Sequence, residues 1–136
     1  MPPPLGSSPA LTGAPLLLLR LEGAAAALVA LALYGGSSGS WLWFAVFALA
    51  PDLSFAGYLA GPRAGAAIYN AAHTYALPLA LWLYGWWTGT ALAELAALIW
   101  IAHIGVDRAL GYGLKYGSSF QDTHLGRIGR PEPVAK

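Results

Sequence analysis

Several ionisable side chains lie within strongly apolar stretches of the chain, where a charged group needs a partner, a water-filled cavity or a role. Four of them could form one site: Asp52, His73, His103 and Asp107. Neutral imidazole and ionised carboxylate supply the nitrogen and oxygen donors that divalent ions such as zinc prefer. Because the sequence contains no cysteine, thiolate ligands are excluded. The four residues are therefore candidate ligands of a divalent metal, with zinc favoured.

Their positions along the apolar stretches predict that they meet. Counted at about 1.5 Å per residue from the ends that carry basic residues, Asp52 and His73 both lie about 13–15 Å deep, and His103 about 10 Å deep. His103 and Asp107 are four residues apart, which places both side chains on one face of a helix. We expect a cytoplasm-facing polar site inside a membrane bundle.

Each pair also has a purely structural interpretation. His103 and Asp107 could form a buried hydrogen bond that fixes one helix, and Asp52 and His73 could form an ordinary bond between helices. Arg20 is expected to extend to the membrane surface. Further polar residues that could support the site are Asn70, Tyr58, Glu22 and His124. The last of these stands in the tail and could be a surface residue or fold back as a fifth ligand.

The composition indicates the elements that position these residues. The chain is 57% hydrophobic and 10% charged, whereas soluble domains carry about 25% charged residues. Apolar stretches long enough to span a bilayer occupy residues 14-34, 40-61, 64-86 and 88-110. Short connections between them predict an all-α integral membrane protein, an up-down bundle of four antiparallel transmembrane helices over 14-110.

The distribution of charge and tryptophan predicts the orientation of the bundle. Every basic residue falls on the side of the two termini and the second connection, and the tryptophans Trp41, Trp43, Trp82, Trp86 and Trp87 gather at the other ends. By the positive-inside rule, both termini are cytoplasmic. Arg20 lies inside its leucine run rather than before it, so we expect the first segment to be retained and not to be a signal peptide. A net charge of +1 argues against nucleic acid as a partner.

The ends of the chain differ in character. Segments 1-13 and 131-136 are expected to be disordered. The stretch 111-130 is polar and glycine-rich but keeps aromatic and aliphatic residues, which predicts a cytoplasmic interfacial tail packed at the mouth of the bundle.

Two runs of sequence carry a family resemblance. The first extends from Pro51-Asp52-Leu53-Ser54 to Tyr69-Asn70-Ala71-Ala72-His73, and the second from His103-Ile104-Gly105-Val106-Asp107-Arg108 to Thr123-His124-Leu125-Gly126. The chain resembles, over about residues 15 to 130, the bacterial membrane proteins catalogued as domain of unknown function 4260. Gly117 departs from the pattern, which leads us to expect proline there. The resemblance implies a protein of the bacterial inner membrane and implies no reaction.

Two classes of function fit these expectations. One is a metal-dependent hydrolase acting on a lipid or other amphipathic substrate. Asp52, His73 and His103 would be ligands, and Asp107 a ligand, a general base or a partner of His103. The alternative is non-enzymatic: an accessory subunit of a larger membrane complex or a small proton or ion relay, for which a homo-oligomer is expected. Haem held between His73 and His103 is a third possibility.

Overall fold

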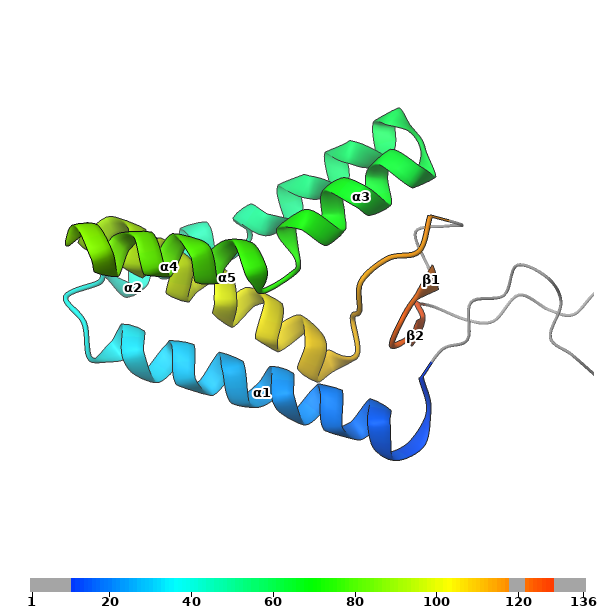
Figure 1. Ribbon diagram of the computed structural model, residues 1–136, viewed down its shortest axis with the longest axis horizontal. Helices are drawn as coiled ribbons and strands as arrows, with labels where there is room; N and C mark the ends of the chain where they lie inside the picture. Colours follow the sequence, from blue (N-terminus) through cyan, green and yellow to red (C-terminus); the bar gives the residue numbers. More distant parts are fainter. Residues whose placement is uncertain (1–10, 118–121, 129–136) are drawn as a thin grey trace, which may run out of the picture.

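The computed structural model describes residues 11–117 and 122–128 and is mainly helical (Figure 1). The expected disordered ends, 1-13 and 131-136, lie mostly or wholly outside these ranges. The elements in chain order are α1 (Gly13–Gly35), α2 (Trp41–Phe47), the 3-10 helix η1 (Ala50–Ala60), α3 (Pro62–Ala72), α4 (Ala76–Thr88), α5 (Ala91–Leu110), β1 (Asp122–Thr123) and β2 (Gly126–Arg127).

The expected helices over 40-61 and 64-86 are each interrupted, so the prediction of continuous helices there was wrong. Proline explains both breaks, because it lacks an N–H and its ring clashes with the carbonyl four residues earlier. Four residues before Pro51 is Phe47, where α2 ends, and four before Pro78 is Thr74, inside the break between α3 and α4. The breaks release backbone carbonyls for other partners.

The core lies where α1 packs antiparallel along α5, and α4 covers another side of α5. Its buried residues are Ala30, Tyr34, Leu98, Ile99 and Ala102. Glycines let the two helices approach: a Cβ on Gly105 would meet the carbonyl oxygen of Gly23 at 2.6 Å, and one on Gly23 would clash with the Arg108 Cβ. Small residues at such crossings are typical of membrane helices.

The hairpin of η1 and α3 projects away from the α1–α5 pair (Figure 1). The tail after α5 folds back towards this hairpin and forms the two-stranded antiparallel ribbon β1–β2, in which the backbone of Asp122 lies opposite that of Arg127. Two hydrogen bonds attach the tail to α3: the Asn70 side-chain amide donates to the Lys115 carbonyl at 2.8 Å, and the Lys115 N–H donates to Asn70 Oδ1 at 2.6 Å. The polar stretch after α5 is therefore ordered against the hairpin in the part that is described.

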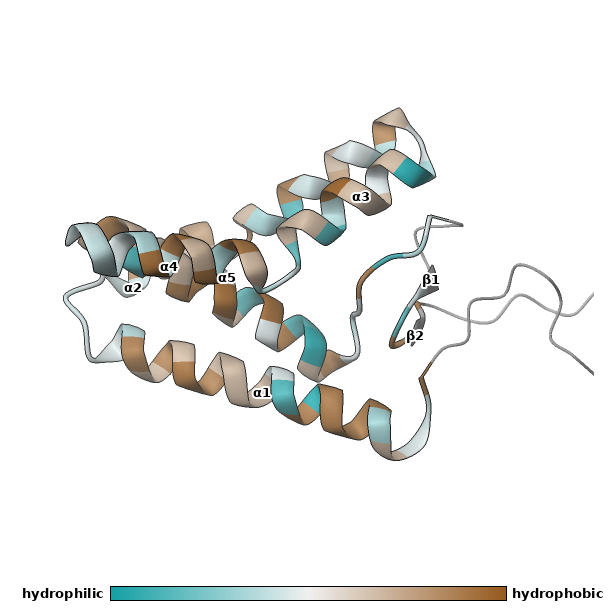
Figure 2. Cartoon of the chain, in the orientation of Figure 1, coloured by the Kyte–Doolittle hydropathy of each residue, from teal (hydrophilic) through white to brown (hydrophobic). Residues whose placement is uncertain are grey.

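Many large apolar side chains of the described residues are exposed, and hydrophobic residues, in brown, recur along α1 and α5 (Figure 2). By length and composition, two segments could cross a membrane, Gly13–Gly35 and Trp41–Ala60, and only 17% and 6% of their most apolar windows are buried inside the molecule. A core helix of a soluble protein would be mostly buried. Of the four expected spans, these two meet the test among the described residues, and the four-span bundle is not confirmed: the break at His73 shortens α3 and α4, and α5 carries Glu94, Asp107 and Arg108.

Candidate metal centre

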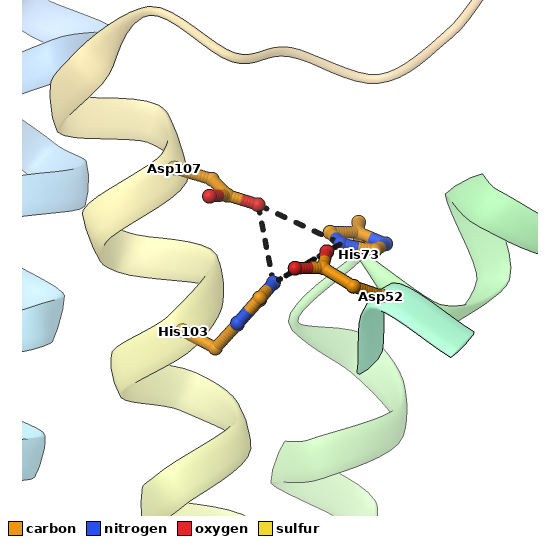
Figure 3. A group of neighbouring side chains, drawn as sticks. All are labelled: Asp52, His73, His103 and Asp107. Atoms are coloured by element: carbon orange, nitrogen blue, oxygen red, sulfur yellow. Dashed lines mark hydrogen bonds and ion pairs between the residues drawn. The ribbon is translucent and has the colours of Figure 1, made fainter. Parts of the chain in front are cut away.

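Two histidines and two aspartates from different elements meet at one point, which we call the His-Asp cluster (Figure 3). Its members are Asp52 at the start of η1, His73 at the end of α3, and His103 and Asp107 on α5. One ligand atom from each residue lies within 4.8 Å of all the others. The four residues expected to meet at similar depth do converge.

The distances inside the cluster are short. Asp52 Oδ1 lies 3.2 Å from Nε2 of both His73 and His103. Asp107 Oδ2 lies 3.5 Å from His73 Nε2 and 3.3 Å from His103 Nε2. The two Nε2 atoms are themselves 3.2 Å apart. Ligands bound tetrahedrally at about 2.0–2.2 Å from zinc would be separated by about 3.3–3.6 Å. The five nitrogen–oxygen and nitrogen–nitrogen spacings are close to that range, and all four ligand atoms lie within 4.8 Å of one another.

Backbone carbonyls fix the orientation of both rings. Nδ1 of His73 lies 2.9 Å from the Tyr69 carbonyl oxygen, and Nδ1 of His103 lies 2.5 Å from that of Ala48. A carbonyl oxygen only accepts, so each Nδ1 carries a proton and each neutral ring has a lone pair on Nε2. Metal-ligating histidines are held by the same kind of bond.

The helix breaks supply several of these contacts. Ala48 follows the end of α2, and its carbonyl accepts from His103 instead of from the next turn of the helix. At the second break, Nη2 of Arg108 donates to the His73 carbonyl at 2.6 Å, and Nε1 of Trp100 donates to the Ala72 carbonyl at 2.6 Å. The prolines that interrupt the helices therefore also help to place the site.

Aromatic and cationic groups stand behind His73. The Tyr69 ring stacks on the imidazole with centroids 3.7 Å apart and planes 11° apart. The Lys115 ammonium lies over the Tyr69 ring, 4.9 Å from its centroid. His73 is fully buried, whereas the side chains of Asp52 and Asp107 are 35% and 19% exposed. Water or a ligand would therefore reach the cluster from the side of the two carboxylates.

The other residues predicted from the sequence lie outside the cluster. Asn70 attaches the tail, the ring of Tyr58 packs over Gly65, and Glu22 is exposed on α1. His124 is not a fifth ligand: its Nδ1 accepts from the Leu114 N–H at 2.8 Å. Arg20 donates to the Ala109 carbonyl at 2.9 Å.

The sequence analysis missed the supporting roles of Arg108, Trp100 and Ala48. Arg108 was assigned only to the basic side of the membrane, yet it is buried and donates to two carbonyls, those of His73 and Tyr112. The available signal was proline: Pro51 and Pro78 mark breaks in the helices, near which backbone carbonyls need other partners.

Comparison with known proteins gives one match. A family described as "Domain of unknown function (DUF4260)" matches residues 16–128, which include the whole His-Asp cluster. No curated protein and no solved structure matches the chain.

Proposed function

The chain belongs to the DUF4260 family, and because the description of that family names no activity, we propose its function from the site. The proposal is a small multi-pass protein of the bacterial inner membrane whose His-Asp cluster binds one divalent ion, zinc in the first instance. The ion serves hydrolysis of a lipid or another amphipathic substrate.

One observation carries the metal proposal: with both imidazoles neutral, the His-Asp cluster brings together only hydrogen-bond acceptors. Each Nδ1–H is taken by a carbonyl, so each neutral ring presents a lone pair on Nε2, and both carboxylates accept only. Acceptors 3.2–3.5 Å apart repel one another unless a metal ion or a proton lies among them. Two neutral imidazoles with two carboxylates would neutralise a divalent charge, which favours burial of the whole site.

The unequal distances suggest different roles for the carboxylates. Asp52 is 3.2 Å from both rings and would be a ligand with them. Asp107, at 3.5 and 3.3 Å, is the better candidate for the general base. Catalytic zinc sites keep three protein ligands and leave one position open, and movement of Asp107 out of the coordination shell would create that position.

Hydrolysis then requires that one proton be taken from water and given to the leaving group. The ion would polarise an ester or amide carbonyl and lower the pKa of water. Asp107 takes a proton from the water as its oxygen attacks the carbonyl carbon, and it returns the proton to the leaving alcohol or amine as the bond to that group breaks. The partly exposed carboxylates give water a path to the site.

Membrane placement is supported by composition and exposure. Two segments have the length and hydropathy to span, and large apolar side chains on α1, α2 and α4 face outward. Contiguous apolar surface of this extent needs a lipid or protein partner. With the basic residues on the side of the termini, we place both termini in the cytoplasm and the lipid bilayer as the main partner.

The metal proposal is tested by measuring metal per folded chain with plasma mass spectrometry. We expect about one divalent ion per chain in the wild type and loss of it in His73→Ala and His103→Ala. His124→Ala, which removes an imidazole outside the cluster, is the matched control and should keep its ion. A wild-type chain without metal, even after divalent ions are added back, would exclude the hydrolase.

The contact between the two rings also favours a second candidate, a proton relay. A proton shared between Nε2 atoms 3.2 Å apart, with Asp52 on the exposed side, would suit proton transfer without metal. Proton flux in liposomes that stops in Asp52→Asn would support this. An accessory subunit, alone or as a homo-oligomer, would instead copurify with its partner and tolerate that substitution.

A further inference from the structure

A cavity of about 740 Å³ lies between α2, the start of η1 and α5. Its size falls within the range of ligand pockets, about 300–1,000 Å³. Three of the lining residues, Ala50, Ala72 and Ala96, have small side chains, and Trp43 and Phe47 contribute large rings. The packing of α2 against α5 is therefore incomplete along this stretch.

The cavity begins beside the His-Asp cluster. Two of its lining residues, Pro51 and Ala72, directly precede Asp52 and His73. Ile99, also in the lining, lies one helical turn before His103 on the same face of α5. From there the lining extends along α5 to Leu92, so the cavity leads away from the cluster.

The lining offers little to a polar ligand. Its hydroxyls already have partners: that of Tyr34 donates to the Ser40 carbonyl at 2.6 Å, that of Ser54 donates to the Pro51 carbonyl at 2.7 Å, and that of Ser40 accepts from the Leu42 N–H at 3.2 Å. The Trp100 indole N–H is taken by Ala72. A ligand with polar groups here would leave them unsatisfied, whereas hydrocarbon would not.

The length of the cavity also suits a hydrocarbon tail. Leu92 to Trp100, both in the lining, span about 12 Å along α5 at about 1.5 Å per residue. A flexible tail can follow apolar walls of this length without displacing them.

We infer that this cavity holds the hydrocarbon tail of the substrate while the polar, hydrolysable end lies at the His-Asp cluster. The inference rests on the proposed function and specifies its substrate class: an amphiphile with an acyl tail and an ester or amide next to its polar end. The tail positions the reacting carbonyl at the ion, and head groups without such a tail are poor substrates.

The test uses a palmitoyl monoacylglycerol that carries a photoreactive diazirine in its tail, added to the zinc-treated protein in phosphatidylcholine nanodiscs. After irradiation, mass spectrometry locates the adducts. We expect them to concentrate on the cavity walls, at Trp43, Phe47, Leu95 and Ile99. Adducts spread evenly over the outward face of α1, which bears Leu28 and Leu33, would overturn the inference.

Blocking variants provide the comparison. Ala96→Trp fills the cavity and should lower the wall adducts about tenfold or more, and Ala50→Phe, at the start of η1, should do the same. Leu28→Trp, on an exposed position of α1, is the matched control and should leave the adducts unchanged. Unchanged adducts in both blocking variants would contradict the inference.

Metal content measured on the same samples separates the two proposals. A normal ion content in the blocking variants shows that they fold and that the cluster is intact. Wild-type protein with wall adducts but no ion would support the tail site and overturn the hydrolase. Wild-type protein with an ion but no wall adducts would support the hydrolase and overturn the tail site.

Discussion

At the scale of single residues, the two carboxylates of the His-Asp cluster are not equivalent. Asp52 is nearer to both rings than Asp107. We predict that Asp52→Asn loses the ion, whereas Asp107→Asn retains it and loses about 10²–10⁴-fold in hydrolysis rate, the usual contribution of a general base. Metal content and release of palmitate from the monoacylglycerol measure the two effects. Loss of the ion in Asp107→Asn and its retention in Asp52→Asn would instead make Asp107 the ligand and Asp52 the general base.

The four cluster residues could be predicted from the sequence because depth and helical spacing are simple functions of residue number. The contacts that hold these four residues in place could not be predicted from the sequence. That Arg108 would donate to the carbonyl of His73 depends on where a helix ends and how α5 is rotated, and residue counting fixes neither. Nor does counting show that the Tyr69 ring stacks on the His73 ring. His124 illustrates the converse, because its type suggested a ligand while its place in the tail gave it a backbone partner.

At the scale of elements, the break between α3 and α4 positions His73. Pro78→Ala should let the helix continue through residues 73–75, move the imidazole and weaken metal affinity about tenfold or more, since ligand geometry tolerates only about 0.5 Å. Pro62→Ala is the control, because Pro62 stands in the first turn of α3, where proline is tolerated. Calorimetric titration with zinc measures both. Equal affinity in Pro78→Ala and wild type would show that the break is irrelevant to the site.

The tail depends on a neutral His124. Burial lowers the pKa of this imidazole below 6.5, and its Nδ1 accepts from the Leu114 N–H only when unprotonated. The stabilisation is therefore complete above pH 6.5 and is lost as the pH falls through the lowered pKa. We predict faster hydrogen exchange of the Leu114 amide below that pKa, after correction for intrinsic rates. His124→Gln should abolish the pH dependence; its persistence there would assign the effect to another group.

At the scale of the whole molecule, cysteine labelling tests the orientation predicted from charge. The chain has no cysteine, so single cysteines report topology directly. With both termini cytoplasmic, Ser38→Cys between α1 and α2 should react with a membrane-impermeant maleimide added to intact cells or spheroplasts. Gly117→Cys in the tail should react only after permeabilisation. Labelling of both sites from outside would contradict the proposed placement.

The fold as a whole was predictable in its helical class and in the order of its apolar segments. The interruption of two of those segments was not expected, because hydropathy averages over a window and ignores where proline removes a backbone donor. For the same reason the cavity between α2 and α5 was not foreseen: it arises from a short α2 and from small residues at Ala50, Ala72 and Ala96.

The central claim is that the His-Asp cluster coordinates a metal ion. X-ray absorption at the zinc edge of the loaded, detergent-purified protein tests it most directly. The account predicts two imidazole nitrogens and one or two carboxylate oxygens at about 2.0–2.2 Å, with the imidazole signal reduced in His73→Ala and unchanged in His124→Ala. A spectrum with only water or phosphate oxygens around zinc, or one identical in all three proteins, would contradict it.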